Sequence, residues 1–499
     1  MKRVMFVVLI FVSLILIACS SSHSSADSDI LPDSDSDNIE TVNDDSDSEE
    51  DSDFIDDSDE KADQDEDADS ESNDTDSDIE EPEEPDEEIF EETEPINGYA
   101  RCYDKIPAGD YEGFFANPYI ESQVKLGLGY DYYDDYEIRE EDLEKVQEIT
   151  VYSQDLRGLE KLVNLKKIQI SGENVYDFTP LSGLTKLKEL ILYSEYMTCL
   201  DGSISLLTNL KTLEIRETKL KDVSPIEQLV NLTSLDLDKN QIEFLPENIG
   251  NLQKLRKINF SYNNIRNIKA LAPLTDLENL GFTNNQVEDI SPLINMTKLV
   301  IINFSSNNVA NISIIENFSK LQALLANNNN IELLPDFQHL GKLQRIYLSF
   351  NNICNLPDLK GLDSLNEMWL DNNNLNNEDF LKLNTLEHVQ FLDVALNNIT
   401  KVPVMKNLKS LQELYLNYNS ITDLSGFADN ESFPALKRLD IGSNKIEDAE
   451  AFRNRTGLSS MWVDRNCIKD FSPLEELKER GTHVGGMNEQ LESCENTGE

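Results

Sequence analysis

The stretch Leu343-Gln344-Arg345-Ile346-Tyr347-Leu348-Ser349-Phe350-Asn351-Asn352-Ile353 is one unit of a pattern that repeats along most of this 499-residue chain. Apolar residues alternate around Ile346 and Leu348, which predicts a short strand with one buried face. The frame L-x-x-L-x-L-x-x-N-x-L begins fifteen times, at spacings near 22 residues, at positions 146, 165, 187, 210, 232, 255, 277, 299, 321, 343, 365, 389, 411, 436 and 458. Such a period predicts an α/β repeat solenoid in which each unit is stabilised mainly by its neighbours.

The strands of successive units are expected to stack into a parallel sheet on the concave face of an arc. At a spacing of about 4.8 Å per strand, fifteen units span on the order of 70 Å. We expect the repeats to occupy residues 146–474, between a helical N-terminal cap region at 96–145 and a C-terminal cap and tail at 475–499.

The segments between strands carry the most specific signal. Glu288-Asp289-Ile290-Ser291-Pro292-Leu293 and Lys221-Asp222-Val223-Ser224-Pro225-Ile226 resemble the 22-residue leucine-rich repeats of internalin-like bacterial proteins, and Phe244-Leu245-Pro246-Glu247-Asn248-Ile249 resembles a variant with Leu-Pro after the strand. The resemblance covers roughly residues 110 to 485. It implies a curved leucine-rich-repeat arc with short 3₁₀ or extended segments on the convex face.

The same resemblance implies that the asparagine after each strand turns inward and binds backbone groups at the bend. These asparagines are at 240, 263, 285, 307, 329, 351, 373, 397, 419, 444 and 466. The first four units have Gln154, Glu173, Glu195 and Thr218 at this place, so we expect a looser, more hydrated ladder there.

The N-terminus is expected to direct export. Residues 1–18 combine Lys2 and Arg3 with an apolar run that is too short for a membrane span and typical of a signal peptide. Leu16-Ile17-Ala18-Cys19-Ser20 resembles the lipobox of bacterial lipoproteins, which implies that Cys19 is lipidated and anchors the chain to a membrane. Ser20 after that cysteine suits the outer membrane, by resemblance to enterobacterial sorting.

Residues 19–95 are expected to form a disordered acidic stalk. From residue 20 to 95 there are 36 acidic residues and one base, Lys61, whereas the rest of the chain from residue 96 has 60 acids against 39 bases. A tract this polar cannot bury enough surface to offset its conformational entropy. It has no glycine and no stretch that fits the frame of a calcium-binding EF-hand loop, and the acidic surface argues against nucleic acid as a partner.

The cap regions carry their own signals. Asn117-Pro118 is a suitable helix start, and Tyr119, Ile120, Val124 and Leu126 follow at helical spacing. With Cys19 lipidated, five cysteines remain and cannot all pair. Export permits disulfides, so Cys467 with Cys494 is a candidate that would pin the tail, Cys102 with Cys199 is a weaker one, and Cys354 is expected to be small and buried.

Catalysis is not indicated. The four histidines, at 23, 339, 388 and 483, share no motif, and the chain has no phosphate-binding glycine loop, Cys-x-x-Cys pair or nucleophile elbow. We therefore expect no enzyme activity, no cofactor and no metal.

The fifth residue of each frame points from the concave sheet into solvent, and both tryptophans of the chain fall on this row. The candidate ligand-binding residues on and beside it are Leu325, Tyr347, Phe350, Trp369, Phe391, Asp393, Tyr415, Tyr418 and Trp462, with Leu396 nearby. A polar rim is expected from Arg345, Glu367, Asp371, Asp393 and Glu413. Exposed aromatic clusters favour recognition, although cross-strand packing that shields the sheet would give the same pattern.

These observations favour a monomeric, surface-displayed binding lipoprotein whose concave face meets another protein or a glycan. The alternative is a structural or spacer element of the cell envelope without a discrete ligand. A periplasmic enzyme or enzyme inhibitor is a third, weaker hypothesis.

Overall fold

The computed structural model describes residues 90–92, 96–99, 102, 105–107, 113–115, 117–131, 135–172 and 174–494. The chain divides into residues 1–88 and a second unit of residues 89–499, and every described residue belongs to the second unit. The signal peptide, the lipidation site Cys19, most of the acidic stalk and His23 therefore lie outside the described residues.

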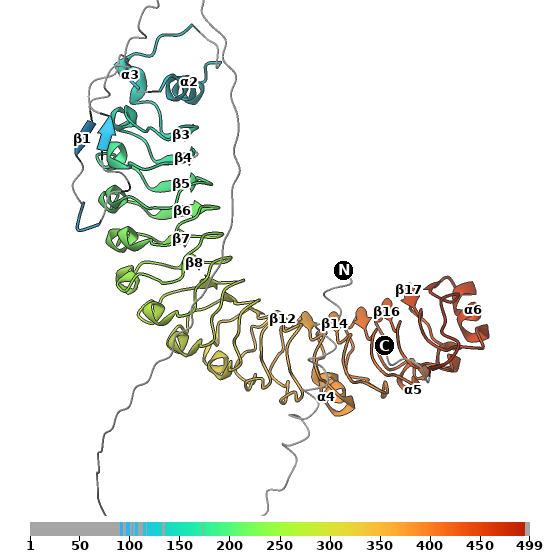
Figure 1. The fold of residues 1–499 in the computed structure, drawn as a ribbon. Helices are drawn as coiled ribbons and strands as arrows, with labels where there is room; N and C mark the ends of the chain where they lie inside the picture. The colour runs from blue at the N-terminus through green and yellow to red at the C-terminus, as the bar shows by residue number, and fades with distance from the viewer. Residues whose placement is uncertain are drawn as a thin grey trace, which may run out of the picture. The chain divides into compact units, whose positions relative to one another are not determined.

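A single sheet of sixteen parallel strands runs through the unit in strict sequence order. It lies on the inner side of the curve of the repeat array (Figure 1). The strands are β3 Glu148–Val151, β4 Lys167–Ser171, β5 Glu189–Tyr193, β6 Thr212–Arg216, β7 Ser234–Asp236, β8 Lys257–Asn259, β9 Asn279–Gly281, β10 Ile301–Asn303, β11 Ala323–Leu325, β12 Arg345–Tyr347, β13 Glu367–Trp369, β14 Phe391–Asp393, β15 Glu413–Tyr415, β16 Arg438–Asp440, β17 Ser460–Trp462 and β18 His483–Gly485. The predicted solenoid is confirmed.

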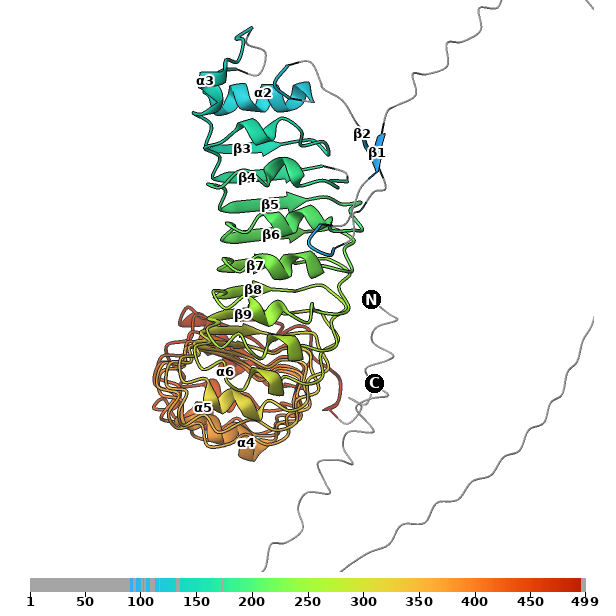
Figure 2. The same ribbon diagram turned by 90° about the vertical axis from the view of Figure 1, so that its left-hand side faces the viewer.

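Short turns of helix cover the outer side of the array (Figure 2). Most are 3₁₀ segments, as predicted: Leu159–Lys161, Thr179–Leu181, Gly202–Leu206, Ser224–Gln228, Ile249–Asn251, Lys269–Leu271, Ser291–Leu293, Ser313–Asn317, Leu383–Thr385 and Glu450–Phe452. Two α-helices, α4 Asn377–Lys382 and α5 Ser425–Ala428, occur in the two longest units, which begin at 365 and 411. The extra residues of those units close an α-helical turn.

The core is one continuous stack of leucine, isoleucine and phenylalanine side chains from every unit. A ladder of asparagines closes it along the edge where the strands end. Asn351 is typical: its Nδ2 donates to the carbonyls of Ala326, Leu348 and Ser349, and its Oδ1 accepts from Ile331 N at 3.1 Å. All eleven predicted asparagines are buried, so their structural role is confirmed.

In the first units, the buried polar residues at the bend after the strand are not all the ones that we expected. Gln154 and Glu195 are exposed, and the buried polar residues there are Ser153 and Ser194, one position earlier. Thr218 is buried and donates to Asn240, which starts the ladder. Small hydroxyl side chains therefore stand where the later units have an amide, and Ser194 Oγ accepts from Val175 N at 3.4 Å; Glu173 lies outside the described residues.

Two short helices cover the N-terminal end of the array. Helix α2, Pro118–Gly127, begins where predicted, with Asn117 Oδ1 accepting from Tyr119 N at 2.8 Å. It buries Ile120 and Val124, whereas Tyr119 and Leu126 are exposed. Helix α3, Glu140–Leu143, follows. The apolar spacing thus located the helix, but only half of its apolar residues enter the core.

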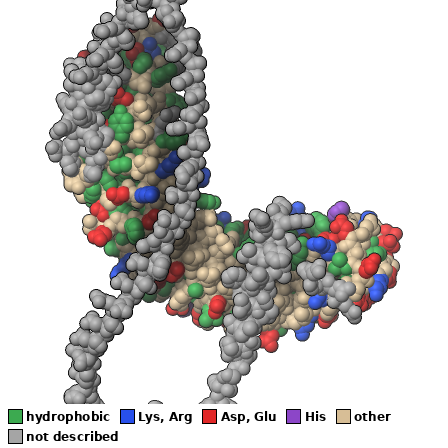
Figure 3. Space-filling model, viewed as in Figure 1, with side chains coloured by type: hydrophobic (Ala, Val, Ile, Leu, Met, Phe, Trp, Pro, Cys, Tyr) green, Lys and Arg blue, Asp and Glu red, His purple; other side chains and the backbone are tan. Residues whose placement is uncertain are grey.

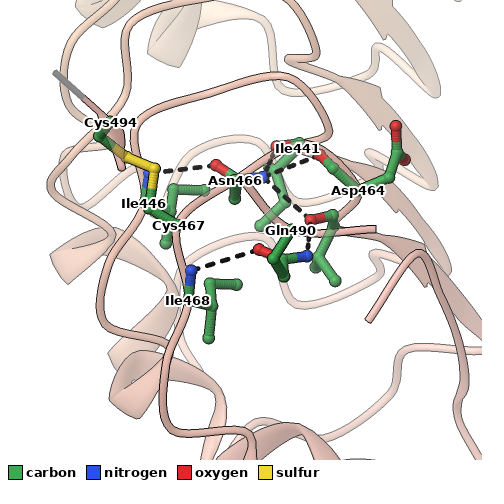
Figure 4. Close-up of a disulfide and its surroundings, with 9 residues drawn as sticks. Ile441, Ile446, Asp464, Asn466, Cys467, Ile468, Gln490 and Cys494 are labelled. Atoms are coloured by element: carbon green, nitrogen blue, oxygen red, sulfur yellow. Dashed lines mark hydrogen bonds between the residues drawn. A yellow bond between two sulfur atoms is a disulfide. The ribbon is translucent and has the colours of Figure 1, made fainter. Parts of the chain in front are cut away.

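At the other end, helix α6, Ser472–Glu479, leads into β18. The expected boundary at residue 474 falls inside this helix. In the tail, Gln490 Nε2 donates to Val463 O at 2.8 Å and Gln490 Oε1 accepts from Ile468 N at 3.2 Å, which continues the asparagine ladder by one step. The disulfide between Cys467 and Cys494 joins the tail to the last repeat beside Asn466 (Figure 4).

The chain enters the folded unit on its convex side. Strand β1, Phe90–Glu92, pairs with β2, Lys105–Pro107, in an antiparallel hairpin, so the residues expected to be disordered stalk up to 95 include a strand. Between these strands, Asn97 Nδ2 donates to Ser205 Oγ at 2.8 Å, and Cys102 is disulfide-bonded to Cys199. Both contacts are to the outer side of the third unit.

Two other expectations concern single features. Cys354 is partly exposed rather than buried, because it lies just beyond the last inward-facing residue of its strand and loop. Within the described ranges, no helix is long and apolar enough to cross a bilayer.

Candidate binding surface on the concave sheet

Four aromatic rings form a continuous ladder across strands β12 to β15. The ring centroids of Tyr347 and Trp369 are 5.4 Å apart, those of Trp369 and Phe391 4.9 Å, and those of Phe391 and Tyr415 5.3 Å. Tyr347, Trp369 and Tyr415 occupy the fifth position of the frame, and Phe391 occupies the third position of its own, on the same face. We call these four residues the aromatic ladder.

The ladder is half-buried, because each ring covers part of its neighbour. Its hydroxyl groups are held by carboxylates of the predicted rim. Tyr347 Oη donates to Glu367 Oε2 at 2.6 Å, and Tyr415 Oη donates to Glu413 Oε2 at 3.1 Å. Burial comes first in raising the pKa of both tyrosines, followed by these carboxylates, so both hydroxyls stay protonated at neutral pH. Arg345, of the predicted rim, is exposed.

The indole N–H of Trp369 is buried and has no acceptor among the described residues. Leaving a buried donor unpaired costs on the order of 1–3 kcal/mol. A phenylalanine would fill this position without that cost, so fold stability alone does not explain a tryptophan here.

Large apolar side chains stand at the eighth position of the frame beside the ladder. Phe350, Leu396 and Tyr418 are exposed by 52%, 41% and 47%, and their φ angles are +56°, +53° and +55°. The left-handed conformation costs most residues about 1–2 kcal/mol, whereas asparagine adopts it easily. Neighbouring units have Asn328 and Asn372 at the equivalent position. Tyr262, outside the ladder, is also 52% exposed at φ +54°, so what distinguishes the ladder is that three such side chains lie beside it.

Acidic side chains alternate with aromatic ones along the fifth-position row. Trp369 pairs in register with Asp393, Asp393 with Tyr415, Tyr415 with Asp440, and Asp440 with Trp462. Hydrophobic and acidic side chains lie side by side on the surface of the C-terminal part of the array (Figure 3).

Asp393 is the most perturbed of these acids. Burial, with the charges of Asp371 and Asp440, raises its pKa to about 7, against the opposing hydrogen bond from Ala395 N at 3.0 Å. Burial likewise raises the pKa of Asp371 and of Asp440. Asp393, which we placed both among the candidate binding residues and in the polar rim, is thus partly buried within the aromatic surface.

The N-terminal part of the concave face is different. Its fifth-position residues on β6 to β10 are Glu214, Asp236, Asn259, Gly281 and Asn303. The acids there are paired, because Arg216 Nη2 lies 2.7 Å from Asp236 Oδ2 and 3.1 Å from Glu214 Oε2. The aromatic and uncompensated acidic surface therefore belongs to the C-terminal half.

Two candidate residues stand apart from the ladder. Leu325 is half-buried on β11, in register with Tyr347. Trp462 is separated from the ladder by Asp440, and its indole lies over Gly485 of the last strand, where an added Cβ would be 2.9 Å from Trp462 Cδ1. Trp462 therefore covers the end of the sheet.

Two features of this surface were not selected from the sequence. Asp440 stood on the fifth-position row but looked like an ordinary polar residue, and the strain at Phe350 is visible only once the eighth position of the frame is seen to be left-handed in successive units. His339, His388 and His483 are exposed. Within the part of the chain that the structure describes, no group of three or more potential ligands is arranged to hold a metal ion.

The comparisons with known proteins agree with this fold. Models of the leucine-rich repeat match residues 208–251, 387–428 and 409–454, and a further one matches residues 230–287. No curated protein matches the chain.

Three solved structures illustrate the likeness. An internalin, InlF, of Listeria monocytogenes is 24% identical over 74% of this chain and 95% of its own, with a TM-score of 0.53. A leucine-rich-repeat protein of Leptospira interrogans is 22% identical over 66% and 91%, with a TM-score of 0.56. The ectodomain of the Arabidopsis thaliana receptor kinase GASSHO1/SCHENGEN3 is 22% identical over 68% and 43%, with a TM-score of 0.54. Together with the sixteen-stranded parallel sheet, these matches show a leucine-rich-repeat fold that resembles the fold of bacterial internalins.

Proposed function

We propose that this chain is a lipoprotein, anchored through Cys19 and displayed on the outer surface of a bacterial cell, whose concave face binds another protein. The observation that carries the proposal is the aromatic ladder from Tyr347 to Tyr415. Aromatic side chains contribute large contact areas at little conformational cost and dominate recognition energetics.

Three features support binding over shielding of the sheet. The Trp369 N–H is buried without an acceptor, and Phe350 and Tyr418 are exposed in a left-handed conformation. Each lowers the stability of the free protein, whereas side chains placed only for packing would raise it. A spacer element without a ligand would not need surface side chains that lower the stability of its own fold.

Other features support outward display. Two disulfides, Cys102–Cys199 and Cys467–Cys494, fit an oxidising compartment. The chain joins the array on its convex side, at Asn97 and Cys102, so the attachment point is on the opposite side from the aromatic ladder. A lipid anchor upstream would leave the concave face accessible.

A protein or peptide partner fits what is bound by structures of the same fold. The GASSHO1/SCHENGEN3 ectodomain is in complex with CASPARIAN STRIP INTEGRITY FACTOR 2, and the plant peptide hormone receptor RGFR1, at 20% identity and a TM-score of 0.56, is in complex with RGF2. These likenesses establish fold alone, and the aromatic ladder is what favours the same use here.

The test is photocrosslinking in the producing cells. A photoreactive phenylalanine analogue replaces Phe350, which is 52% exposed beside the ladder, or Phe244, which is 77% exposed in the loop that leaves β7. We expect irradiation to link a discrete protein at position 350 and not at position 244. Identical products from both positions, or none from position 350, would contradict a protein-binding concave face; a linked polysaccharide would indicate a glycan ligand instead.

A further inference from the structure

The aromatic surface holds three acidic side chains that form no ion pair with any residue that the structure describes. Asp371, Asp393 and Asp440 are partly buried, and none of them has a Lys, Arg or His within ion-pair distance among the described residues. On this face, Arg438 pairs with Glu413 at 3.3 Å. Asp371, Asp393 and Asp440 instead accept hydrogen bonds from Ser349 Oγ, Ala395 N and Gly442 N, respectively.

The charged forms of these three carboxyl groups are therefore unfavourable in the free protein. Burial raises the pKa of all three carboxyl groups, and their mutual repulsion contributes to the pKa of Asp393. A cation brought to this surface would relieve both effects. In the N-terminal half, Arg216 already does so for Glu214 and Asp236.

The strand register sets the distance between Asp393 and Asp440. Asp393 is flanked in register by Trp369 and Tyr415, and Asp440 by Tyr415 and Trp462. Each acid thus lies between two aromatic side chains on adjacent strands. Since neighbouring strands are about 4.8 Å apart, the two acids are separated by about 10 Å.

We propose that the partner bound by the concave face presents two basic side chains, about 10 Å apart, whose charged ends pair with Asp393 and Asp440 between the flanking aromatic rings. This inference rests on the proposed function. Lysine and arginine suit such a site because their apolar stems pack on aromatic surface and their charges interact with ring faces. Close charge pairs that are shielded from water also couple strongly across interfaces.

The test selects ligands without assuming their identity. The full-length protein is panned against phage-displayed random dodecapeptides, and the enriched peptides are synthesised. Their Kd values are measured for the unmodified protein, Asp393→Asn, Trp369→Ala and Glu288→Gln. Glu288 is an exposed acid on a convex-side segment, so Glu288→Gln removes the same charge away from the concave face.

We expect enriched peptides to carry at least two lysines or arginines, and Asp393→Asn and Trp369→Ala each to weaken binding at least tenfold while Glu288→Gln changes it less than twofold. Basic peptides that bind Asp393→Asn as tightly as the unmodified protein would overturn the inference. So would uncharged or acidic peptides, although their dependence on Trp369 would leave concave-face binding standing. If no enriched peptide depends on Trp369, both proposals fail.

Discussion

The indole of Trp369 on β13 stacks on the ring of Phe391 on β14, with centroids 4.9 Å apart and planes inclined by 21°. The two residues are at different positions of the repeat frame, fifth and third, so the contact is diagonal across the parallel strands. Phe391 thereby bridges Trp369 and Tyr415, although Asp393 lies between them in the register.

The two tryptophans are predicted to differ in role. Trp369→Ala should weaken binding of the partner captured at position 350 by about 2 kcal/mol, which is roughly thirtyfold. Trp462→Ala should lower the melting temperature, because it uncovers Gly485 at the end of the sheet, and should weaken binding less than Trp369→Ala, because Trp462 flanks only Asp440. Titration calorimetry and thermal unfolding measure the two effects. Unchanged affinity with a lower melting temperature for Trp369→Ala would show that the ladder serves packing.

Phe350→Asn is predicted to stabilise the fold and impair binding. Asparagine adopts the left-handed conformation that Phe350 holds at φ +56°, so the free energy of unfolding should rise by about 1 kcal/mol. Asn328 and Asn372 show that the neighbouring units accept this residue. Urea unfolding and partner affinity are measured together, and a destabilised variant would mean that Phe350 contributes packing instead.

Removal of one asparagine of the ladder is predicted to lower the free energy of unfolding strongly. Asn373 Nδ2 donates to the carbonyls of Leu348, Leu370 and Asp371, and its Oδ1 accepts from Ile353 N. Asn373→Ala leaves these buried groups unpaired and should lower the unfolding free energy by about 2–4 kcal/mol. Asn374→Ala is the matched control, because the Asn374 side chain is partly exposed and lies outside the ladder. Equal effects of the two substitutions in urea unfolding would refute the assigned role.

Replacement of Asp393 by asparagine is predicted to stabilise the fold at high pH and not at low pH. Its pKa is about 7 in the folded protein and about 3.9 in an unfolded chain, so the folded state binds the proton more tightly and loses stability as the pH rises from about 4 to 7. The groups that face it are Asp371, Asp440 and Tyr415. Asp393→Asn removes this loss and should raise the melting temperature by about 1–3 °C at pH 8.

At pH 4, where the Asp393 carboxyl group is protonated in the folded protein, the same substitution should change the melting temperature little. A gain of the same size at both pH values would indicate that the effect is not due to the buried charge.

The repeat frame predicted most of the fold because a strict period leaves few ways to bury its apolar residues. The inward asparagines and the outer 3₁₀ turns were implied by the resemblance to internalin-like repeats. The first units deviated because Ser153 and Ser194 are small hydroxyl residues that the L-x-x-L-x-L-x-x-N frame does not mark. The path of residues 96–102 along the convex side depends on single long-range contacts, such as that of Cys102 with Cys199, which carry no periodicity.

The candidate surface was predictable only in part. Alternation placed Tyr347, Trp369 and Tyr415 on one face, but their stacking through Phe391 depends on side-chain directions that a period does not set. The same is true of Asp393, whose burial between two aromatic residues makes it more than part of a polar rim. The role of Trp462 changed because the residue opposite it in the next strand is Gly485.

Display of the concave face to the exterior is tested most directly by protease treatment of intact producing cells, followed by detection of the repeat array in the medium. The acidic tract of residues 20–95 has the composition of an accessible linker, so we predict that the protease releases an array still closed by its disulfides and able to bind the partner captured at position 350. Protection of the array until the envelope is broken would contradict outward display and the binding role built on it.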